Sequence, residues 1–346
     1  MSFSRLSMPC PSAEVENFLS APPPGVVSFC REAKDDFMIL GAGGKMGLHL
    51  TTMLQRGFEA AGKLNRVIAV SRFGSVNDRE AFEEHGVKTI ACDLAEPEQL
   101  AKLPACENVI FMAGAKFGTA GRPDILQKMN VEMPWNVAQH FRGSAITAYS
   151  TGCVYSYAPV DSTGSTEASE VNPPGAYAQS CLGREQAFER ASREFGTRVT
   201  LIRLNYSVEF RYGVLVDIAT KVLNDTPVDV TMGHFNIIWQ RDAVAYTLQA
   251  HAHAASLPFV LNVTGPGTHK TRDVALKFGE IFGKQVTFTG VEAETAWLNN
   301  AGKSHRLFGP PEVTMEQMIQ WVAAWLAAEN PTHGKPTGFE KRDGNF

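Results

Sequence analysis

The stretch Phe37-Met-Ile-Leu40-Gly41-Ala-Gly-Gly44-Lys45-Met46-Gly47 decides the fold of this chain. Its first four residues are all apolar, as is typical of a short strand buried on both faces of a parallel sheet. Glycines then stand at 41, 44 and 47, and apolar residues recur at helical spacing as far as residue 58. A glycine turn between a buried strand and an amphipathic helix lets backbone N–H groups bind the pyrophosphate of a dinucleotide. The stretch therefore predicts a dinucleotide-binding unit, with glycines that serve only a tight turn as the alternative.

Strands and helices alternate after this stretch. Apolar runs predict strands at residues 67–70, 89–91, 108–112, 145–149 and 199–203. Asn77 and Glu80 have the spacing of a capping box for a helix that ends near Gly86, and a long helix is expected from 124 to 141. Another helix begins at about Tyr177. This order predicts an α/β fold with a doubly wound parallel sheet and right-handed crossovers over residues 36–205.

The flanking segments have weaker patterns. In residues 1–35, a short helix from Ser12 to Leu19 is ended by Pro22-Pro-Pro-Gly25. This arm either packs on the domain or on a partner subunit, or it is a partly ordered leader. Residues 206–330 contain shorter pieces, with expected helices at 212–223, 241–253, 270–282 and 313–328 and strands at 236–239, 259–263 and 285–289. The tail, 331–346, is expected to be a loop.

Composition excludes several classes of partner. The 346 residues carry a net charge of -4, which gives no reason to expect nucleic acid or an anionic membrane surface as a partner. No apolar run approaches the ~20 residues that cross a bilayer, and the first ten residues lack the pattern of a secretory signal. Six scattered cysteines are typical of reduced thiols, so we expect a cytoplasmic protein. His251 and His253 would leave different faces of one helix, so no metal site is predicted.

Two further segments carry a family resemblance. Ser150-Thr151-Gly-Cys153-Val-Tyr155 and Tyr177-Ala-Gln-Ser-Cys181 resemble the active-site segments of the extended short-chain dehydrogenases, the family of NAD-dependent sugar epimerases and dehydratases. Over residues 36–330, the resemblance implies an NAD(P)-dependent oxidoreductase, epimerase or isomerase that acts on a sugar or sugar acid. Tyr177 would be the acid/base and Thr151 would orient the reacting hydroxyl. The family further implies a small substrate lobe, 206–330, with some elements returning to the main sheet, and we expect a homodimer.

The chain departs from the family at one position. The family reads Tyr-x-x-x-Lys where this chain has Cys181. Residues four apart share a helix face, and the lysine both lowers the phenol pKa and holds the nicotinamide ribose. Bringing a phenol from a pKa of ~10 to neutrality takes ~4 kcal/mol, which an uncharged cysteine cannot supply.

Three residues are candidates to replace the lysine. Lys116 follows the fourth strand at the ligand-binding edge of the sheet, where it could raise the local potential beside the nicotinamide or bind a substrate carboxylate, unless it is only a solvated loop lysine. Arg184 lies seven residues after Tyr177 on the same helix face, although Glu185 or solvent is its more ordinary partner. Cys181 itself is either a thiolate base or inert packing. The substrate could also supply the charge.

The cofactor is expected to be NADP, with NAD as the alternative. The second strand ends in Ser71-Arg72, where an acidic residue would bind the 2′-hydroxyl of NAD. A guanidinium suits a 2′-phosphate, with Lys45 as a second cation, unless Arg72 is only a solvated charge. Asp93 would contact adenine or cap the next helix. The full set of expected cofactor contacts is Gly41, Gly44, Lys45, Met46, Gly47, Ser71, Arg72, Asp93, Leu94, Ala113, Gly114, Ala115 and Cys181.

Substrate contacts are expected from Lys116, Cys153, Tyr155, Asn205 and Arg211, the last of which suits a carboxylate or phosphate. A competing hypothesis is an NADP-binding sensor or scaffold without hydride transfer. Loss of the lysine supports that hypothesis, whereas retention of both Thr151 and Tyr177 opposes it.

Overall fold

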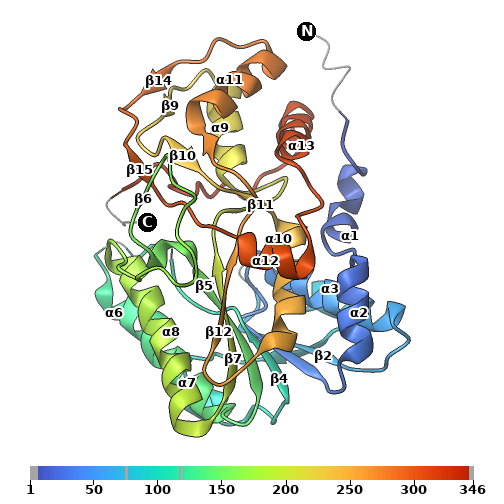
Figure 1. Cartoon of the computed structure of the whole chain (residues 1–346). Coiled ribbons are helices and arrows are strands. Elements are labelled where there is room, and N and C mark those ends of the chain that lie inside the picture. Colours follow the sequence, from blue (N-terminus) through green and yellow to red (C-terminus); the bar gives the residue numbers. More distant parts are fainter. Residues whose placement is uncertain (1–6, 75–76, 117, 120, 343–346) are drawn as a thin grey trace.

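A seven-stranded parallel sheet forms the centre of the molecule (Figure 1). The computed structural model describes residues 7–74, 77–116, 118–119 and 121–342. The strand order is β12-β7-β5-β4-β1-β2-β3. Successive strands are added on one side of β1 as far as β3 and then on its other side from β4 onward, so the strand order reverses between β1 and β4. The strands are β1 (Phe37–Leu40), β2 (Val67–Ser71), β3 (Lys88–Ala91), β4 (Asn108–Phe111), β5 (Ala145–Thr151), β7 (Arg198–Leu204) and β12 (Phe259–Val263). The prediction of a doubly wound parallel sheet is confirmed.

Helices cover both faces of this sheet. In β1, Phe37 and Ile39 face the core that α2, α3 and α10 share, whereas Met38 and Leu40 face the core under α5, α7 and α8. This alternation explains why β1 is apolar at every position. The helices are α2 (Pro24–Glu32), α3 (Gly47–Ala60), α4 (Arg79–Glu83), α5 (Pro97–Leu100), α6 (Pro123–Gln127), α7 (Met133–His140), α8 (Ala176–Phe195) and α10 (Gln240–Ala250).

The N-terminal arm packs on the protein as two helices. After a 3₁₀ turn (Ser12–Glu14), α1 (Val15–Leu19) contributes Val15 and Leu19 to the core of the second lobe. The proline segment starts α2 rather than only ending α1, because Pro24 occupies the first helical position, where its missing N–H is harmless. Cys30 of α2 packs against Gly57 of α3, where a Cβ atom would lie 2.7 Å from Sγ.

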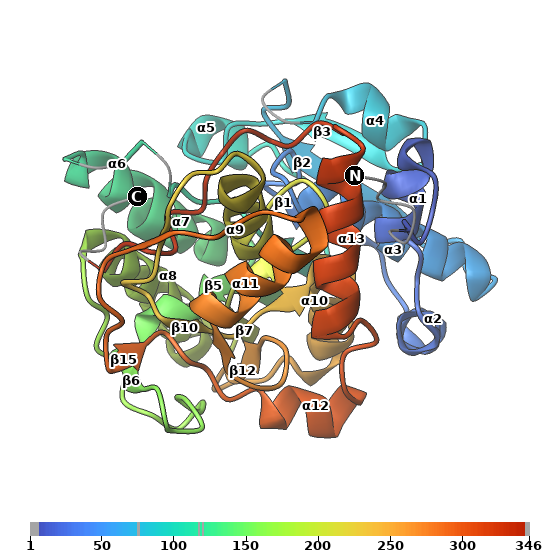
Figure 2. The same cartoon turned by 90° about the horizontal axis from the view of Figure 1, so that it is seen from above.

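The second lobe lies above the C-terminal ends of the strands (Figure 1). Its helices α9 (Val214–Leu223), α11 (Thr271–Phe282) and α13 (Met315–Ala327) pack against one another, as Figure 2 shows from above. A short helix that the sequence did not predict, α12 (Gly302–Phe308), contacts β12. The small strands pair as β6 (Ala158–Pro159) with β15 (Thr295–Ala296), β8 (Ser207–Val208) with β11 (Ile238–Trp239), β9 (Val228–Asp229) with β14 (Phe288–Thr289), and β10 (His234–Phe235) with β13 (His269–Lys270).

Two local predictions fail for identifiable reasons. The expected capping box is absent: α4 begins at Arg79, and the amide of Asn77 donates to the carbonyl of Gly44 at 3.0 Å. The single helix expected over 124–141 is α6 and α7 joined by a π-helical turn, Lys128–Glu132. π-Turns of this kind are frequent at functional sites.

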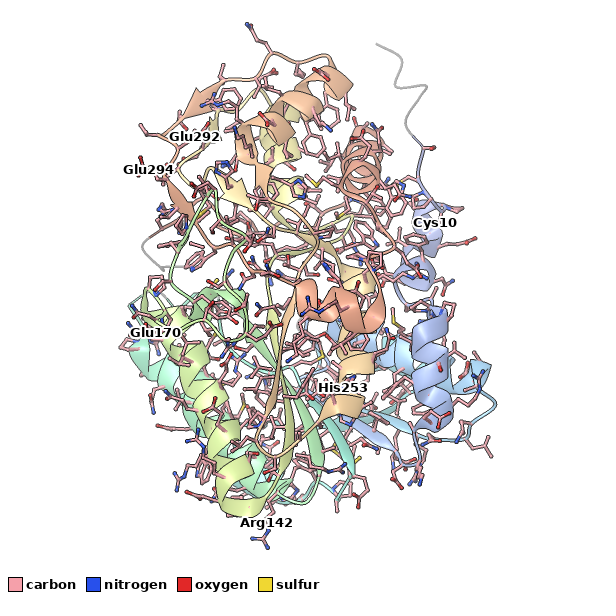
Figure 3. All side chains as sticks on the ribbon, in the orientation of Figure 1. Cys10, Arg142, Glu170, His253, Glu292 and Glu294 are labelled. Atoms are coloured by element: carbon pink, nitrogen blue, oxygen red, sulfur yellow. The ribbon has the colours of Figure 1, made fainter. Side chains whose placement is uncertain are left out.

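The two histidines at 251 and 253 diverge. His251 is buried, with Nδ1 at 2.8 Å from Oγ1 of Thr147. His253, which is labelled in Figure 3, stacks on the ring of Phe259. Over the described ranges, no helix is long and apolar enough to cross a bilayer.

Candidate active site

A cavity of about 360 Å³ opens where the direction of the sheet reverses, beside the ends of β1, β2, β3 and β4. In doubly wound sheets this crevice is where dinucleotides bind. The cavity brings together eight of the residues that the sequence assigned to the cofactor, namely Gly41, Gly44, Ser71, Arg72, Asp93, Leu94, Ala113 and Gly114.

The glycine turn fits a dinucleotide. Gly41 has φ of 84°, and a Cβ atom there would lie 2.6 Å from the backbone nitrogen of Ala113. A Cβ atom on Gly47 would lie 1.9 Å from the carbonyl oxygen of Ala42. Packing therefore demands both of these glycines. Gly44 differs, because it is exposed and a Cβ atom there would meet only the carbonyl oxygen of Gly41, at 3.7 Å.

Packing does not require a glycine at position 44, and this residue lines the cavity. No side chain caps α3, whose N-cap is Met46, so N–H groups of its first turn are available to a ligand. A pyrophosphate bound at this turn would lie against Gly44 and accept hydrogen bonds from the uncapped N–H groups of α3.

The adenosine end of the cavity is polar. The Arg72 side chain is 70% exposed, and its Nη1 lies 3.6 Å from Oδ2 of Asp93. Asp93 also accepts a hydrogen bond from the backbone N–H of Ala95 at 3.0 Å, and the N-cap of α5 is Glu96, so Asp93 closes a turn and does not cap the helix. Ser71 lies beneath Gly43, where a Cβ atom would meet Oγ at 2.5 Å.

Lys45 lies elsewhere than we expected. Its Nζ sits 3.3 Å from the centre of the Tyr212 ring, and Lys45 does not line the cavity that contains Arg72. The glycine turn therefore directs this lysine toward the substrate lobe, which corrects the expectation that it would add a second cation for a 2′-phosphate.

Tyr177 lies at the beginning of α8. It lies in the first turn of α8, directly after Gly175 and Ala176, and hydrogen-bonds with the side chain of Cys181 one turn later. Cys181 is fully buried beside Val154 and Tyr155. Burial raises the pKa of the Cys181 thiol, and burial followed by the charge of Cys181 raises the pKa of Tyr177 well above its ordinary value. The phenol is therefore protonated at neutral pH.

Lys116 approaches this tyrosine. Its Nζ lies 5.7 Å from the centre of the Tyr177 ring, and its charge interacts with Cys153 and Cys181. Burial lowers the pKa of Lys116. Thr151 ends β5, and its Oγ1 accepts a hydrogen bond from the N–H of Cys153 at 3.2 Å. The structure thus places Lys116, Cys153 and Cys181 around Tyr177.

Tyr155 and Asn205 are not placed to contact a substrate. Tyr155 is 1% exposed, donates to Oδ1 of Asn262 at 2.8 Å and accepts from Nη1 of Arg203 at 2.8 Å. Asn205 is 2% exposed and donates to the carbonyl of Trp297. Both were expected substrate contacts, and both instead connect strand ends inside the protein.

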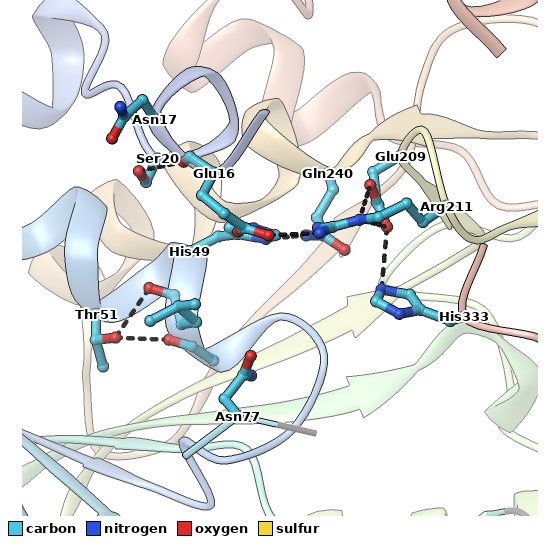
Figure 4. A network of polar contacts seen from close by, with 12 residues as sticks. Glu16, Asn17, Ser20, His49, Thr51, Asn77, Glu209, Arg211, Gln240 and His333 are labelled. Carbon is cyan, nitrogen blue, oxygen red and sulfur yellow. Dashed lines mark hydrogen bonds and ion pairs between the residues drawn. The ribbon is translucent and has the colours of Figure 1, made fainter. Parts of the chain in front are cut away.

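Arg211 is likewise occupied by the protein. It forms ion pairs with Glu16 of the N-terminal arm and with Glu209, which is also 3.3 Å from Nε2 of His333 (Figure 4). Arg211 still lines a second cavity of about 210 Å³, which Tyr212 and Lys335 also line. Its role as an anion contact is therefore weaker than its sequence position indicated, because two carboxylates already bind it.

Asn130 holds the backbone next to the cavity, a role that its position in the sequence did not indicate. It is fully buried in the π-helical turn. Its Oδ1 accepts from the N–H of Ala115 at 2.8 Å, while its Nδ2 donates to the carbonyl of Ala115 at 2.8 Å and to Oγ of Ser180 at 2.9 Å. A polar residue at an inward position of the predicted 124–141 helix was the available signal. Asn130 fixes the segment Ala113–Ala115 that lines the cofactor cavity.

Arg184 does not pair with its neighbour. Glu185 forms two hydrogen bonds with Arg203, at 3.0 and 2.7 Å, and accepts another from Ser150. Arg184 reaches back along α8 and donates to Asn130 at 2.7 Å. The guanidinium therefore lies under the cofactor segment rather than in solvent.

Solved structures of nucleotide-sugar enzymes share this fold. A UDP-galactose 4-epimerase is 21% identical with a TM-score of 0.68, over 86% of this chain and 99% of that one. The UDP-glucose 4-epimerase of Thermotoga maritima, solved with UDP-glucose, is 16% identical with a TM-score of 0.69, over 86% and 99% of the two chains. A dTDP-glucose 4,6-dehydratase from Streptomyces venezuelae, solved as a double mutant with NAD, is 17% identical with a TM-score of 0.72, over 84% and 96%. At these identities the likeness shows the fold alone.

Sequence comparison identifies the family. No curated protein matches the chain. Residues 37–232, more than half of the 346, match the NAD dependent epimerase/dehydratase family, and they include the glycine turn, Lys116, Thr151 and Tyr177. The doubly wound parallel sheet and the crevice at its switch point agree with this match. The chain belongs to the NAD-dependent epimerase/dehydratase family, whose members are enzymes of the extended short-chain dehydrogenase type.

Proposed function

We propose that this enzyme moves hydride to or from the carbon that bears a hydroxyl of a sugar or sugar acid, with Tyr177 as the acid/base. The observation that carries the proposal is the approach of Lys116 to Tyr177, beside the segment Ala113–Ala115 that lines the cofactor cavity. The bound nicotinamide would supply or accept the hydride. The sugar class is supported by the fold neighbours, which are described as UDP-sugar epimerases and a dTDP-sugar dehydratase.

Each residue has a defined task in this proposal. Because its pKa is raised, Tyr177 holds its proton at rest and donates it to a substrate carbonyl oxygen, or regains it from a hydroxyl in the reverse direction. Thr151 offers a hydroxyl that orients the same oxygen. Lys116 stabilises the phenolate: a charge about 6 Å away at an effective dielectric constant of about 20 contributes ~3 kcal/mol. That offsets only part of the cost, which exceeds the ~4 kcal/mol of an ordinary phenol because burial raises the pKa of Tyr177.

We further propose that NADP is preferred over NAD. Arg72 is exposed at the adenosine end of the cavity, and among the residues that the structure describes only Asp93 pairs with it, at 3.6 Å. A 2′-phosphate would replace that weak surface pair with charge-assisted hydrogen bonds. NAD remains the alternative, since Asp93 lies in the same cavity and bears the acidic group that a ribose hydroxyl would bind.

Fluorescence titration with NADPH and NADH tests the cofactor. Arg72→Ala should weaken NADPH binding about tenfold and leave NADH binding unchanged, since a charge-assisted hydrogen bond contributes ~1.5–3 kcal/mol. Arg79→Ala is the matched control, because Arg79 is also exposed and pairs with Glu83 on α4. Equal loss for both cofactors would contradict the NADP assignment, and no binding of either would contradict the proposal as a whole.

Turnover is tested with nucleotide sugars and sugar acids as substrates. Tyr177→Phe should remove activity while cofactor binding persists, and unchanged turnover would refute the mechanism. Product stereochemistry and the amount of cofactor consumed distinguish net oxidation from epimerisation.

A sensor or scaffold that binds NADP without hydride transfer is the second candidate. The observation in its favour is that fully buried Cys181, which brings no positive charge, occupies the lysine position, while burial raises the pKa of Tyr177. Tight cofactor binding without turnover of any nucleotide sugar or sugar acid would favour this candidate.

A further inference from the structure

Arg184 is a buried cation whose acceptors are uncharged. It lies two helical turns after Tyr177 on α8 and is 7% exposed. Nη1 donates to the carbonyl of Tyr149 at 3.0 Å and Nη2 to Oδ1 of Asn130 at 2.7 Å, while Nε has no hydrogen-bond partner in the part of the chain that the structure describes. Burying a guanidinium in this way opposes folding, because no carboxylate among the described residues forms an ion pair with it. A buried charge that opposes folding is a candidate for a functional role.

The guanidinium lies directly against the cofactor segment. A Cβ atom on Gly114 would lie 2.1 Å from Nη2 of Arg184 and 2.8 Å from Oδ1 of Asn130. Gly114 also lines the cofactor cavity, so the glycine has the cavity on one side and the guanidinium on the other. Asn130 connects the two, because one oxygen accepts both from Arg184 and from the N–H of Ala115.

The charge of Arg184 also acts on the reacting tyrosine. Burial and Cys181 raise the pKa of Tyr177, whereas Arg184 lowers it. Arg184 likewise opposes the effect of burial on the pKa of Cys181. Lys116 is a less constant source of charge, because burial lowers its own pKa, while a guanidinium keeps its proton at every relevant pH.

We infer that Arg184 is a positioning residue that supplies part of the positive charge of the missing lysine and holds the segment Ala113–Ala115 through Asn130. The inference rests on the proposed function for the role of Tyr177. Its structural alternative is that Arg184 merely connects α8, β5 and the π-helical turn. Lys116, with Nζ 5.7 Å from the centre of the Tyr177 ring, then supplies the rest of the charge, so two cations from different elements do the work of one lysine.

The direct test is the acidity of the phenol at position 177. In the full-length protein, Tyr177 is replaced by 3,5-difluorotyrosine, whose phenol is more acidic and titrates while the protein stays folded, and its ionisation is followed by ¹⁹F NMR. Arg184→Met should raise the pKa of this phenol by about one unit, as expected for loss of a nearby opposite charge, and Arg184→Lys should restore most of the shift. Arg190→Met is the matched control, because Arg190 is an exposed arginine of α8 that pairs with Glu194.

Two more measurements distinguish positioning from simple support. Arg184→Met should weaken NADPH binding about tenfold, because the segment Ala113–Ala115 loses its support. It should not lower the midpoint of urea unfolding, because the substitution also removes a buried charge that opposes folding. Cys181→Lys in the Arg184→Met background should restore both the phenol pKa and cofactor binding. A lower unfolding midpoint with an unchanged phenol pKa would overturn the inference in favour of the structural alternative.

If Arg184→Met does not fold, Gly114→Ala decides, because its new methyl group displaces Nη2 while the arginine remains. It should raise the phenol pKa in the same direction, and an unchanged value would overturn the inference. The ¹⁹F titration needs no cofactor. A wild-type protein that binds neither NADPH nor NADH would therefore refute the proposed function and still leave the result for Arg184 readable.

Discussion

Lys45 provides a quantitative test of the electrostatics around the glycine turn. Burial, followed by the charges of Lys335 and Lys116, lowers the pKa of Lys45 from its ordinary 10.5 to about 8. A fall of about 2.5 in pKa corresponds to at most ~3 kcal/mol of folding free energy at neutral pH, and to ~2 kcal/mol once water screening of this partly buried ammonium is counted. The contact of Nζ with the Tyr212 ring, at 3.3 Å, returns ~1 kcal/mol. We therefore expect Lys45→Met to be more stable than the wild type by up to ~1 kcal/mol at pH 7.

The sign of the pH dependence follows from the lowered pKa. The unfolded chain keeps the proton up to about pH 10.5, whereas the folded protein releases it near pH 8. The unfavourable charge is thus fully present below pH 8, and its effect fades as the pH rises toward 10.5. The advantage of Lys45→Met over the wild type should accordingly shrink between pH 8 and pH 10.

Urea unfolding at pH 7 and pH 10 measures both effects. Lys102→Met is the control, because Lys102 is an exposed surface lysine and its replacement should change the free energy of unfolding by less than ~0.5 kcal/mol. A Lys45→Met protein that is less stable than the wild type at pH 7, or a difference that does not narrow by pH 10, would refute the reasoning.

Three other substitutions test the remaining features. Glu185→Ala should lower the free energy of unfolding by ~3–5 kcal/mol, because it leaves the buried guanidinium of Arg203 without its carboxylate; a loss below ~1 kcal/mol by urea unfolding would contradict this. Glu16→Gln should cost about 1 kcal/mol at pH 7: burial favours a raised pKa, but His49 and Arg211 outweigh it and lower the Glu16 pKa to about 2, and a side chain 41% exposed is partly screened by water. That difference should be lost as the pH falls from 4.5 toward 2, and one that persists in acid would speak against the pairing. Gly44→Ala should leave the unfolding midpoint within the error of the wild type but weaken NADPH binding at least tenfold, whereas an unchanged affinity would remove pyrophosphate from this turn.

The parts of the fold that the sequence predicts best are those governed by local burial. The run Phe37–Leu40 is buried on both faces, so its continuous apolar pattern marks the strand directly. The proline segment before it was harder to interpret, because a proline ends one helix and starts the next with equal ease. The π-helical turn left no pattern in composition beyond Asn130, since its geometry depends on contacts with Ala115 and Ser180.

The site residues that sequence reasoning misplaced are those with partners far along the chain. Arg211 pairs with Glu16, 195 residues earlier, and no motif announces that contact. Tyr155 is held by Asn262, 107 residues later. The direction of the Lys45 side chain could not be predicted from the sequence either. The glycine turn fixes the backbone at Lys45, but the Tyr212 ring that its ammonium contacts belongs to the second lobe.

The cysteine at position 181 shows the same difference between a local motif and contacts made by residues elsewhere in the chain. A motif shows which residue is missing, whereas its replacement can come from any element that packs against the vacated charge. Arg184 can act in this way because two helical turns keep it on the face of Tyr177, and because Gly114 leaves room for its Nη2. A side chain at position 114 would push the guanidinium away, so glycine at 114 and arginine at 184 form one unit with cysteine at 181. In this view the cysteine is not the loss of a catalytic part, because part of the charge lies on another residue of α8 and Gly114, in the loop after β4, leaves the space for it.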